Sequence, residues 1–198
     1  MPRITGTGRA GFTLVELIVT LGVLASVVGG VFAMLQTGSR AFQVASSGRR
    51  IENLVMETLD QIADKLRASK LSTIAPQQTP PFSSNSVDFQ RTVGYAGAVT
   101  VWSTTERILL QNGQVLWIQD LGLPTERTTV WADSVPAFLQ GETANGVDDN
   151  TNGLIDESGL CFTFTGSSVV VRLTLRTKTS SGTTLTHTAQ ERVFFRNR

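Results

Sequence analysis

The chain has one cysteine, Cys161, and one histidine, His187, among its 198 residues. A single cysteine cannot form a disulfide within the chain, so cysteine content does not report the redox compartment. A catalytic triad, a zinc site or a histidine general base would have to be built around His187, which lies among threonines on a predicted strand and is expected to face solvent. Because G-x-S-x-G, G-x-x-x-x-G-K-[ST], G-x-G-x-x-G and H-E-x-x-H are also missing, we expect a protein that is not an enzyme.

The chain also lacks a charge excess of either sign. Lysine and arginine number 17 against 16 aspartate and glutamate residues, a net charge of +1. A basic nucleic-acid footprint and an acidic disordered tail are therefore both unsupported, and no nucleic acid is expected as a partner. The length suits one globular domain plus an extended element.

Residues 12–35 form an apolar run in which Glu16 is the one formally charged side chain, and Arg3 and Arg9 precede it. As a helix the run would be about 36 Å long, enough to cross a hydrocarbon core of about 30 Å. The arginines predict a cytoplasmic N-terminus and a translocated chain beyond about residue 36. A secretory signal would have a shorter apolar region, and a plain anchor leaves the costly carboxylate of Glu16 unexplained.

The segment GFTLVELIVTLGVLA, residues 11–25, resembles the class III signal of type IV prepilins and type II secretion pseudopilins. The resemblance implies a leader of residues 1–11, cut between Gly11 and Phe12 by a prepilin peptidase, followed by N-methylation of Phe12. It further implies assembly with other pilin or pseudopilin subunits on an inner-membrane platform. Glu16 would then pair with the N-terminal amine of a neighbouring subunit inside the apolar bundle, where a charge pair fixes register.

The helical pattern continues beyond the apolar run. Apolar residues recur at steps of three or four between charged ones, namely Ile51, Val55, Leu59, Ile62 and Leu66. The pattern predicts one helix from residue 12 to about Leu71, with an extracytoplasmic part within residues 36–75 and Gly29-Gly30 as a weak point. Such a helix, roughly 90 Å long, exceeds one small domain, so its outer half should pack on the head. A coiled coil is the alternative.

Residues 76–198 are predicted to be a β-rich globular head, entered through the proline- and serine-rich connector 76–86. Asn112-Gly113, between two β-prone runs in residues 107–119, predicts a hairpin. Residues 169–178 and 185–195 predict an antiparallel pair with one buried face. The expected fold class is α+β: a long N-terminal transmembrane helix packed on a mainly antiparallel sheet. The three tryptophans are expected in the core: Trp102, Trp117 and Trp131.

A candidate calcium loop lies in ETANGVDDNTNGLIDE, residues 142–157. Calcium prefers oxygen ligands at alternate positions, with glycine at the sharp turn. The loop lacks the glutamate at position twelve and the flanking helices of an EF-hand. It resembles instead the N-G-x-D-D-x-x-x-G-x-x-D-E repeats of bacterial surface proteins, as one copy with weak, structural binding. An ordinary polar turn is the alternative. The candidate ligands are Asp148, Asn150, Asn152, the Leu154 carbonyl, and Asp156 or Glu157.

The ending ERVFFRNR and the strand-rich head resemble J-type minor pseudopilins and W-type minor pilins. The resemblance implies a minor pseudopilin of a type II secretion pseudopilus, at or near its tip. It would sit in the bacterial inner membrane as a single-pass protein, with its head periplasmic or extracellular. The alternatives are a minor pilin of a type IV pilus or DNA-uptake filament, and a membrane-anchored binding domain that uses a pilin-type export signal.

Overall fold

The structure, a computed structural model, describes residues 11, 13–180 and 182–196. Its one α-helix, α1, spans Leu14–Arg67. The chain divides into two units, Met1–Gln43 and Val44–Arg198, and α1 contributes to both. Of the predicted leader only Gly11 is among the described residues, and Phe12, the first residue of the predicted transmembrane helix, lies outside them.

In the first unit, α1 presents a continuous apolar surface. Its large apolar side chains from Leu14 to Leu35 are all exposed. The most apolar stretch has a mean hydropathy of 2.4, and none of it is buried within the protein. A core helix of a soluble protein would bury such side chains. By length and composition α1 is therefore able to cross a membrane.

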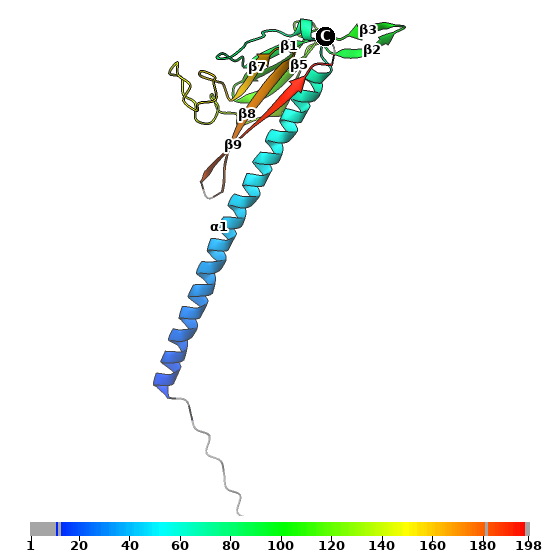
Figure 1. The fold of residues 1–198 in the computed structure, drawn as a ribbon. Coiled ribbons are helices and arrows are strands. Elements are labelled where there is room, and N and C mark those ends of the chain that lie inside the picture. The colour runs from blue at the N-terminus through cyan, green and yellow to red at the C-terminus, as the bar shows by residue number, and fades with distance from the viewer. Residues whose placement is uncertain (1–10, 12, 181, 197–198) are drawn as a thin grey trace, which may run out of the picture. The chain divides into compact units, whose positions relative to one another are not determined.

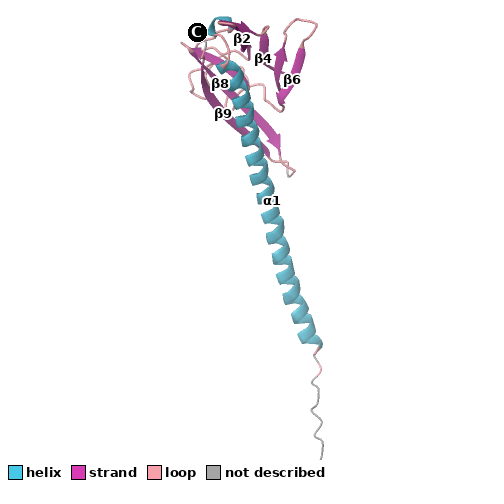
Figure 2. Ribbon diagram, turned by 90° about the vertical axis from the view of Figure 1, so that its right-hand side faces the viewer, coloured by secondary structure: helices cyan, strands magenta, loops and turns pink. Residues whose placement is uncertain are grey.

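In the second unit, the C-terminal part of α1 packs on the β-rich head (Figures 1 and 2). The predicted apolar stripe is confirmed, because all five of its members are buried in the same core as residues of the strands. Thr58 and Ala63 are buried beside them. The head itself therefore covers the stripe, and no second helix is required to bury it.

The predicted C-terminal end of α1 near Leu71 is wrong, because the helix ends at Arg67. The next residues leave the helix to meet another part of the chain: Ser69 forms a bridge with Arg91, and the Lys70 N–H donates to the Gln90 carbonyl at 3.0 Å. The Ser69 hydroxyl binds the Lys65 carbonyl at 2.8 Å, which satisfies a group at the helix end. A short 3-10 helix follows at Leu71–Thr73.

The first sheet of the head is antiparallel, with the order β1-β4-β5-β6. Its strands are β1 (Ser86–Phe89), β4 (Glu106–Gln111), β5 (Gln114–Gln119) and β6 (Arg127–Ala132). The predicted hairpin is confirmed as β4 and β5. Its two turn residues, Asn112 and Gly113, have φ of 52° and 72°, the left-handed conformation that such a turn requires.

The second sheet has three antiparallel strands, β7 (Leu160–Thr165), β8 (Ser168–Lys178) and β9 (Thr184–Phe194). A separate hairpin joins β2 (Thr92–Ala96) and β3 (Val99–Trp102). The α+β arrangement and the C-terminal pair are thus confirmed. The prediction of one buried face is wrong for β8, where Thr174 is fully buried. The reason is a covering loop, since the Gln140 N–H donates to the Thr174 hydroxyl at 3.3 Å.

Two of the three tryptophans lie at the margin of the core. Trp117 and Trp131 are partly buried against it and stack on each other, with ring centroids 5.3 Å apart. Trp102 lies on the small β2-β3 hairpin, with Lys70 Nζ 5.6 Å from its ring centroid. The core prediction therefore holds in part for Trp117 and Trp131, whereas Trp102 is not in the core cluster.

The single thiol gives a test of head packing. Cys161 is fully buried in β7, and burial, with a smaller effect from the negative charge of Glu157, raises its pKa to about 12 although Arg172 opposes the shift. At pH 8 the thiolate fraction is then on the order of 10⁻⁴. We expect DTNB to react with the native full chain in detergent at least about 100-fold more slowly than with the guanidinium-unfolded chain. Equal rates in both states would contradict this packing.

Candidate functional site

The first candidate site is the start of α1. The Glu16 carboxylate accepts hydrogen bonds from the Thr13 N–H at 3.1 Å and the Thr13 hydroxyl at 2.9 Å, and the Glu16 N–H donates to the Thr13 hydroxyl at 3.3 Å. This reciprocal arrangement is a capping box. It satisfies donors that a helix start otherwise leaves without partners.

The capping box gives Glu16 a local role in addition to the one implied by the prepilin resemblance. The spacing T-x-x-E from Thr13 to Glu16 is the sequence signal for this cap. Gly11 is exposed just before this helix start, and Phe12 is outside the described residues. The charge of Glu16 and its cap are separable chemically, because glutamine also completes a capping box.

The second candidate site is the long loop between β6 and β7. Main-chain bonds close its two ends: the Leu139 N–H donates to the Glu157 carbonyl at 2.9 Å, and the Gly159 N–H donates to the Ala137 carbonyl at 3.1 Å. The side chain of Leu154 is buried and anchors the middle of the loop. The loop therefore has a fixed path although it contains little regular structure.

Three of the predicted ligands lie together in one tight turn. The Asp148 carboxylate accepts the N–H groups of Asn152 at 3.1 Å and Gly153 at 2.8 Å. The side-chain oxygens of Asn150 and Asn152 accept the N–H groups two residues on, at 3.1 and 2.9 Å. Gly153 has a φ of 87°, which explains why glycine stands there.

The two remaining predicted acidic ligands, Asp156 and Glu157, have different hydrogen-bond partners. Asp156 accepts the N–H groups of Asn145 and Gly146, each at 3.0 Å, and so closes a second turn. Glu157 instead reaches Asn152, whose amide donates to it at 2.5 Å. Within the described ranges, no group of three or more His, Cys, Asp or Glu side chains is arranged to hold a metal ion. A cation here would need amide or main-chain oxygens as well.

Glu142 is a loop residue that the predicted ligand set omitted. Its carboxylate is buried and accepts the Asn150 N–H at 3.0 Å. Burial raises its pKa, as do the negative charges of Glu157 and Asp149, whereas the bond from Asn150 lowers it. Glu142 and Glu157 therefore bring two negative groups close together inside the protein.

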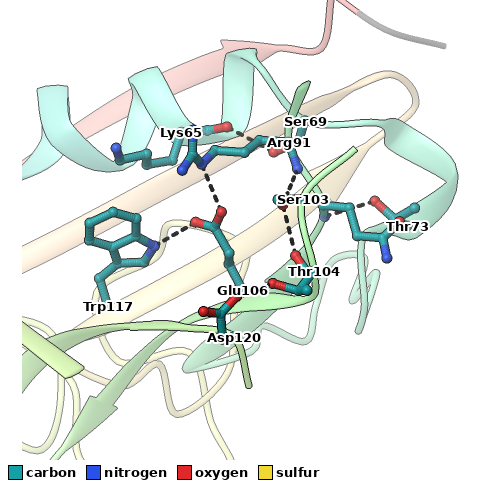
Figure 3. Close-up of polar contacts among 10 residues, drawn as sticks. Lys65, Ser69, Thr73, Arg91, Ser103, Thr104, Glu106, Trp117 and Asp120 are labelled. Carbon is teal, nitrogen blue, oxygen red and sulfur yellow. Dashed lines mark hydrogen bonds and ion pairs between the residues drawn. The ribbon is translucent and has the colours of Figure 1, made fainter. Parts of the chain in front are cut away.

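A third polar cluster lies under the end of α1 (Figure 3). Glu106 is 2% exposed; one of its oxygens accepts Arg91 Nε at 2.7 Å and the other accepts Trp117 Nε1 at 2.8 Å. Lys65 Nζ lies 4.2 Å from the centroid of the Trp117 ring. Both carboxylate oxygens have partners, so the cluster is suited to holding α1 on the first sheet and not to binding a ligand.

His187 lies on β9, opposite Leu175 of β8, and is half-buried instead of fully solvent-facing. Neighbouring strand positions carry Thr186 and Thr188, and Thr188 is bonded to Thr174 and Gln140. Among the described residues, no acid or nucleophile forms a hydrogen bond or ion pair with the His187 imidazole.

Comparison with known proteins gives a match at the first candidate site, the start of α1. The family model described as the prokaryotic N-terminal methylation motif matches residues 7–32. This is the prepilin-type signal, and together with the long apolar helix on antiparallel sheets it fits a type IV pilin-like protein. The motif implies processing by prepilin peptidase and assembly with pilins. No curated protein and no solved structure matches the chain.

Proposed function

We propose that this chain is a non-enzymatic minor pseudopilin, assembled at or near the tip of the periplasmic pseudopilus of a type II secretion system. The observation that carries the proposal is the prepilin-type signal at the start of α1, a helix that continues into the core of a β-rich head. A single helix would thus join a membrane-embedded assembly segment to a folded domain, which is what a filament subunit requires.

The proposed topology is a single pass through the inner membrane, with a cytoplasmic N-terminus before processing. Arg3 and Arg9 precede the apolar run, which supports this orientation by the positive-inside rule. The head would then be periplasmic. The exposed apolar surface of α1 supports both stages of the proposal, because it suits lipid before assembly and neighbouring helices afterwards.

A structural role also agrees with the chemistry of the head. The Cys161 thiol, whose pKa burial raises to about 12, is a poor nucleophile. His187 is paired across the sheet with Leu175 and has no acid beside it in the described contacts. These two residues supply no nucleophile and base pair of the kind that covalent hydrolysis uses.

The test is cross-linking of the tagged subunit in its native cell envelope, followed by mass spectrometry of the co-purified proteins and of its own N-terminal peptide. Pseudopilins with a secretin, and an N-terminus at a methylated Phe12, are expected. A dominant major pilin would instead assign the chain to a type IV pilus or DNA-uptake filament. An uncut leader without pilin-like partners would overturn the filament proposal and leave a membrane-anchored binding domain.

Glu16 allows the charge to be tested separately from the cap. We expect Glu16→Gln to reduce cross-linking to neighbouring subunits at least about tenfold, because glutamine preserves the cap but cannot pair with an amine. Thr13→Ala is the matched control: it removes both bonds of the Thr13 hydroxyl, keeps the main-chain bond from the Thr13 N–H and keeps the charge of Glu16, so cross-linking should stay near wild type. The reverse pattern would show that Glu16 acts only as a cap.

A further inference from the structure

Two buried carboxylates in the loop between β6 and β7 each have an oxygen with no partner. Glu142 is 7% exposed and Glu157 is 0% exposed. One oxygen of each is satisfied, by the Asn150 N–H at 3.0 Å and by the Asn152 amide at 2.5 Å. The other oxygen of each, Oε2, is buried without any hydrogen-bond donor.

This arrangement is unfavourable for the protein alone. A buried carboxylate needs a counter-charge or a full set of donors, and two adjacent ones repel each other. The burial of Glu142 and the negative charge of Glu157 both raise the pKa of Glu142. No Lys or Arg is recorded in an ion pair with either glutamate in the described part of the chain. A positive group from outside the chain would resolve the conflict.

We propose that Glu142 and Glu157 hold a divalent cation of the calcium type, completed by side-chain and main-chain oxygens of the turn at residues 148–154. The candidate donors are all oxygens, which favours a hard cation such as calcium over zinc or copper. Calcium takes six to eight ligands in flexible geometry, so two carboxylates and several neutral oxygens suit it.

The site differs from the ligand set predicted from sequence in one of its two main carboxylates. Glu142 is new, and it lies 15 positions before Glu157 in the chain numbering. A cation between them would join the first and last parts of the loop, which main-chain bonds already bring together. Asp156 is committed to Asn145 and Gly146 and so helps to shape the loop. The inference does not depend on the filament function.

The competing explanation is a proton shared by the two carboxyl groups. A shared proton would remove the repulsion without any metal. It predicts a head that is stabilised by acid and indifferent to calcium, whereas a cation site predicts stabilisation by calcium at neutral pH.

The experiment measures the melting temperature of the full chain in detergent at pH 7.5, in 10 mM CaCl₂ and in EGTA, with calorimetric titration of CaCl₂. MgCl₂ serves as the ion control. With a Kd on the order of 10⁻⁴ M, typical of extracellular calcium sites, 10 mM calcium shifts the folding equilibrium about 100-fold. We therefore expect the melting temperature to rise by several degrees in calcium and by much less in magnesium.

Glu142→Gln and Glu157→Gln should each abolish the calcium shift and the titration heat. Their melting temperatures in EGTA should stay near or above wild type, since glutamine removes the repulsion, and this shows that they fold. Asp133→Asn is the matched control, because it removes one exposed carboxylate outside the proposed site, and it should keep the shift. The proposal would be overturned if the melting temperature of the wild type does not respond to calcium and rises in acid. It would also be overturned if both Gln variants keep the full calcium-dependent shift in melting temperature.

Discussion

Replacing Gly159 by alanine is expected to destabilise the head by about 3 kcal/mol or more, because the new methyl group has no room. A Cβ at this position would lie 2.1 Å from the Pro136 carbonyl oxygen and 2.8 Å from Val135 Cγ1. The backbone of residue 159 is held on both sides: its N–H donates to Ala137 at 3.1 Å and its carbonyl accepts the Thr174 N–H at 2.7 Å. The clash with the Pro136 carbonyl therefore cannot be relieved by a side-chain rotation and requires the backbone at residues 136 and 159 to move apart.

The comparison for this variant is Gly48→Ala, the same chemical change in α1. Beyond its chain neighbours and the adjacent helix backbone, no heavy atom lies within 4 Å of a Cβ there. Alanine is the better helix former, so stability should be unchanged or slightly higher. Both variants would be followed by guanidinium unfolding of the full chain in detergent, with far-UV circular dichroism. A Gly159→Ala protein within 1 kcal/mol of wild type would contradict the close packing of residues 136 and 159.

The elements that could be predicted from sequence are those with a local cause. Asn112-Gly113 requires only that two adjacent residues adopt positive φ, and the structure has the hairpin there. The apolar stripe from Ile51 to Leu66 needs only helical periodicity, and it is buried as expected. The prepilin-type signal is also local, and its family match confirms it.

The elements that could not be predicted depend on partners distant in sequence. The helix α1 ends at Arg67 because residues 69–70 pair with residues 90–91. The sequence near residue 67 contains no pattern that predicts this end. The alternating pattern of β8 places Thr174 on the face that was predicted to be exposed. In the structure the loop that follows β6 covers this side chain. Glu142 is one acid in a polar segment, and its significance appears only when the fold buries it beside Glu157.

The buried pair of Arg91 and Glu106 is expected to show an asymmetric response to mutation. Arg91→Met should cost about 3 kcal/mol, because Glu106 is 2% exposed and would remain as a buried carboxylate with only the Trp117 N–H (Figure 3). Glu106→Gln should cost less, roughly 1 to 2 kcal/mol. The Arg91 side chain is 28% exposed, so its charge can still reach water.

A double-mutant cycle separates the interaction energy between Arg91 and Glu106 from the effect of each substitution on its own. Arg91→Met combined with Glu106→Gln should be more stable than Arg91→Met alone, because the unpaired charge is gone. Arg107→Met is the comparison: its partner Asp88 is 25% exposed, and a pair near the surface should cost about 1 kcal/mol or less. Equal costs for Arg91→Met and Arg107→Met, measured by guanidinium unfolding, would mean that Glu106 has more access to water than its burial implies.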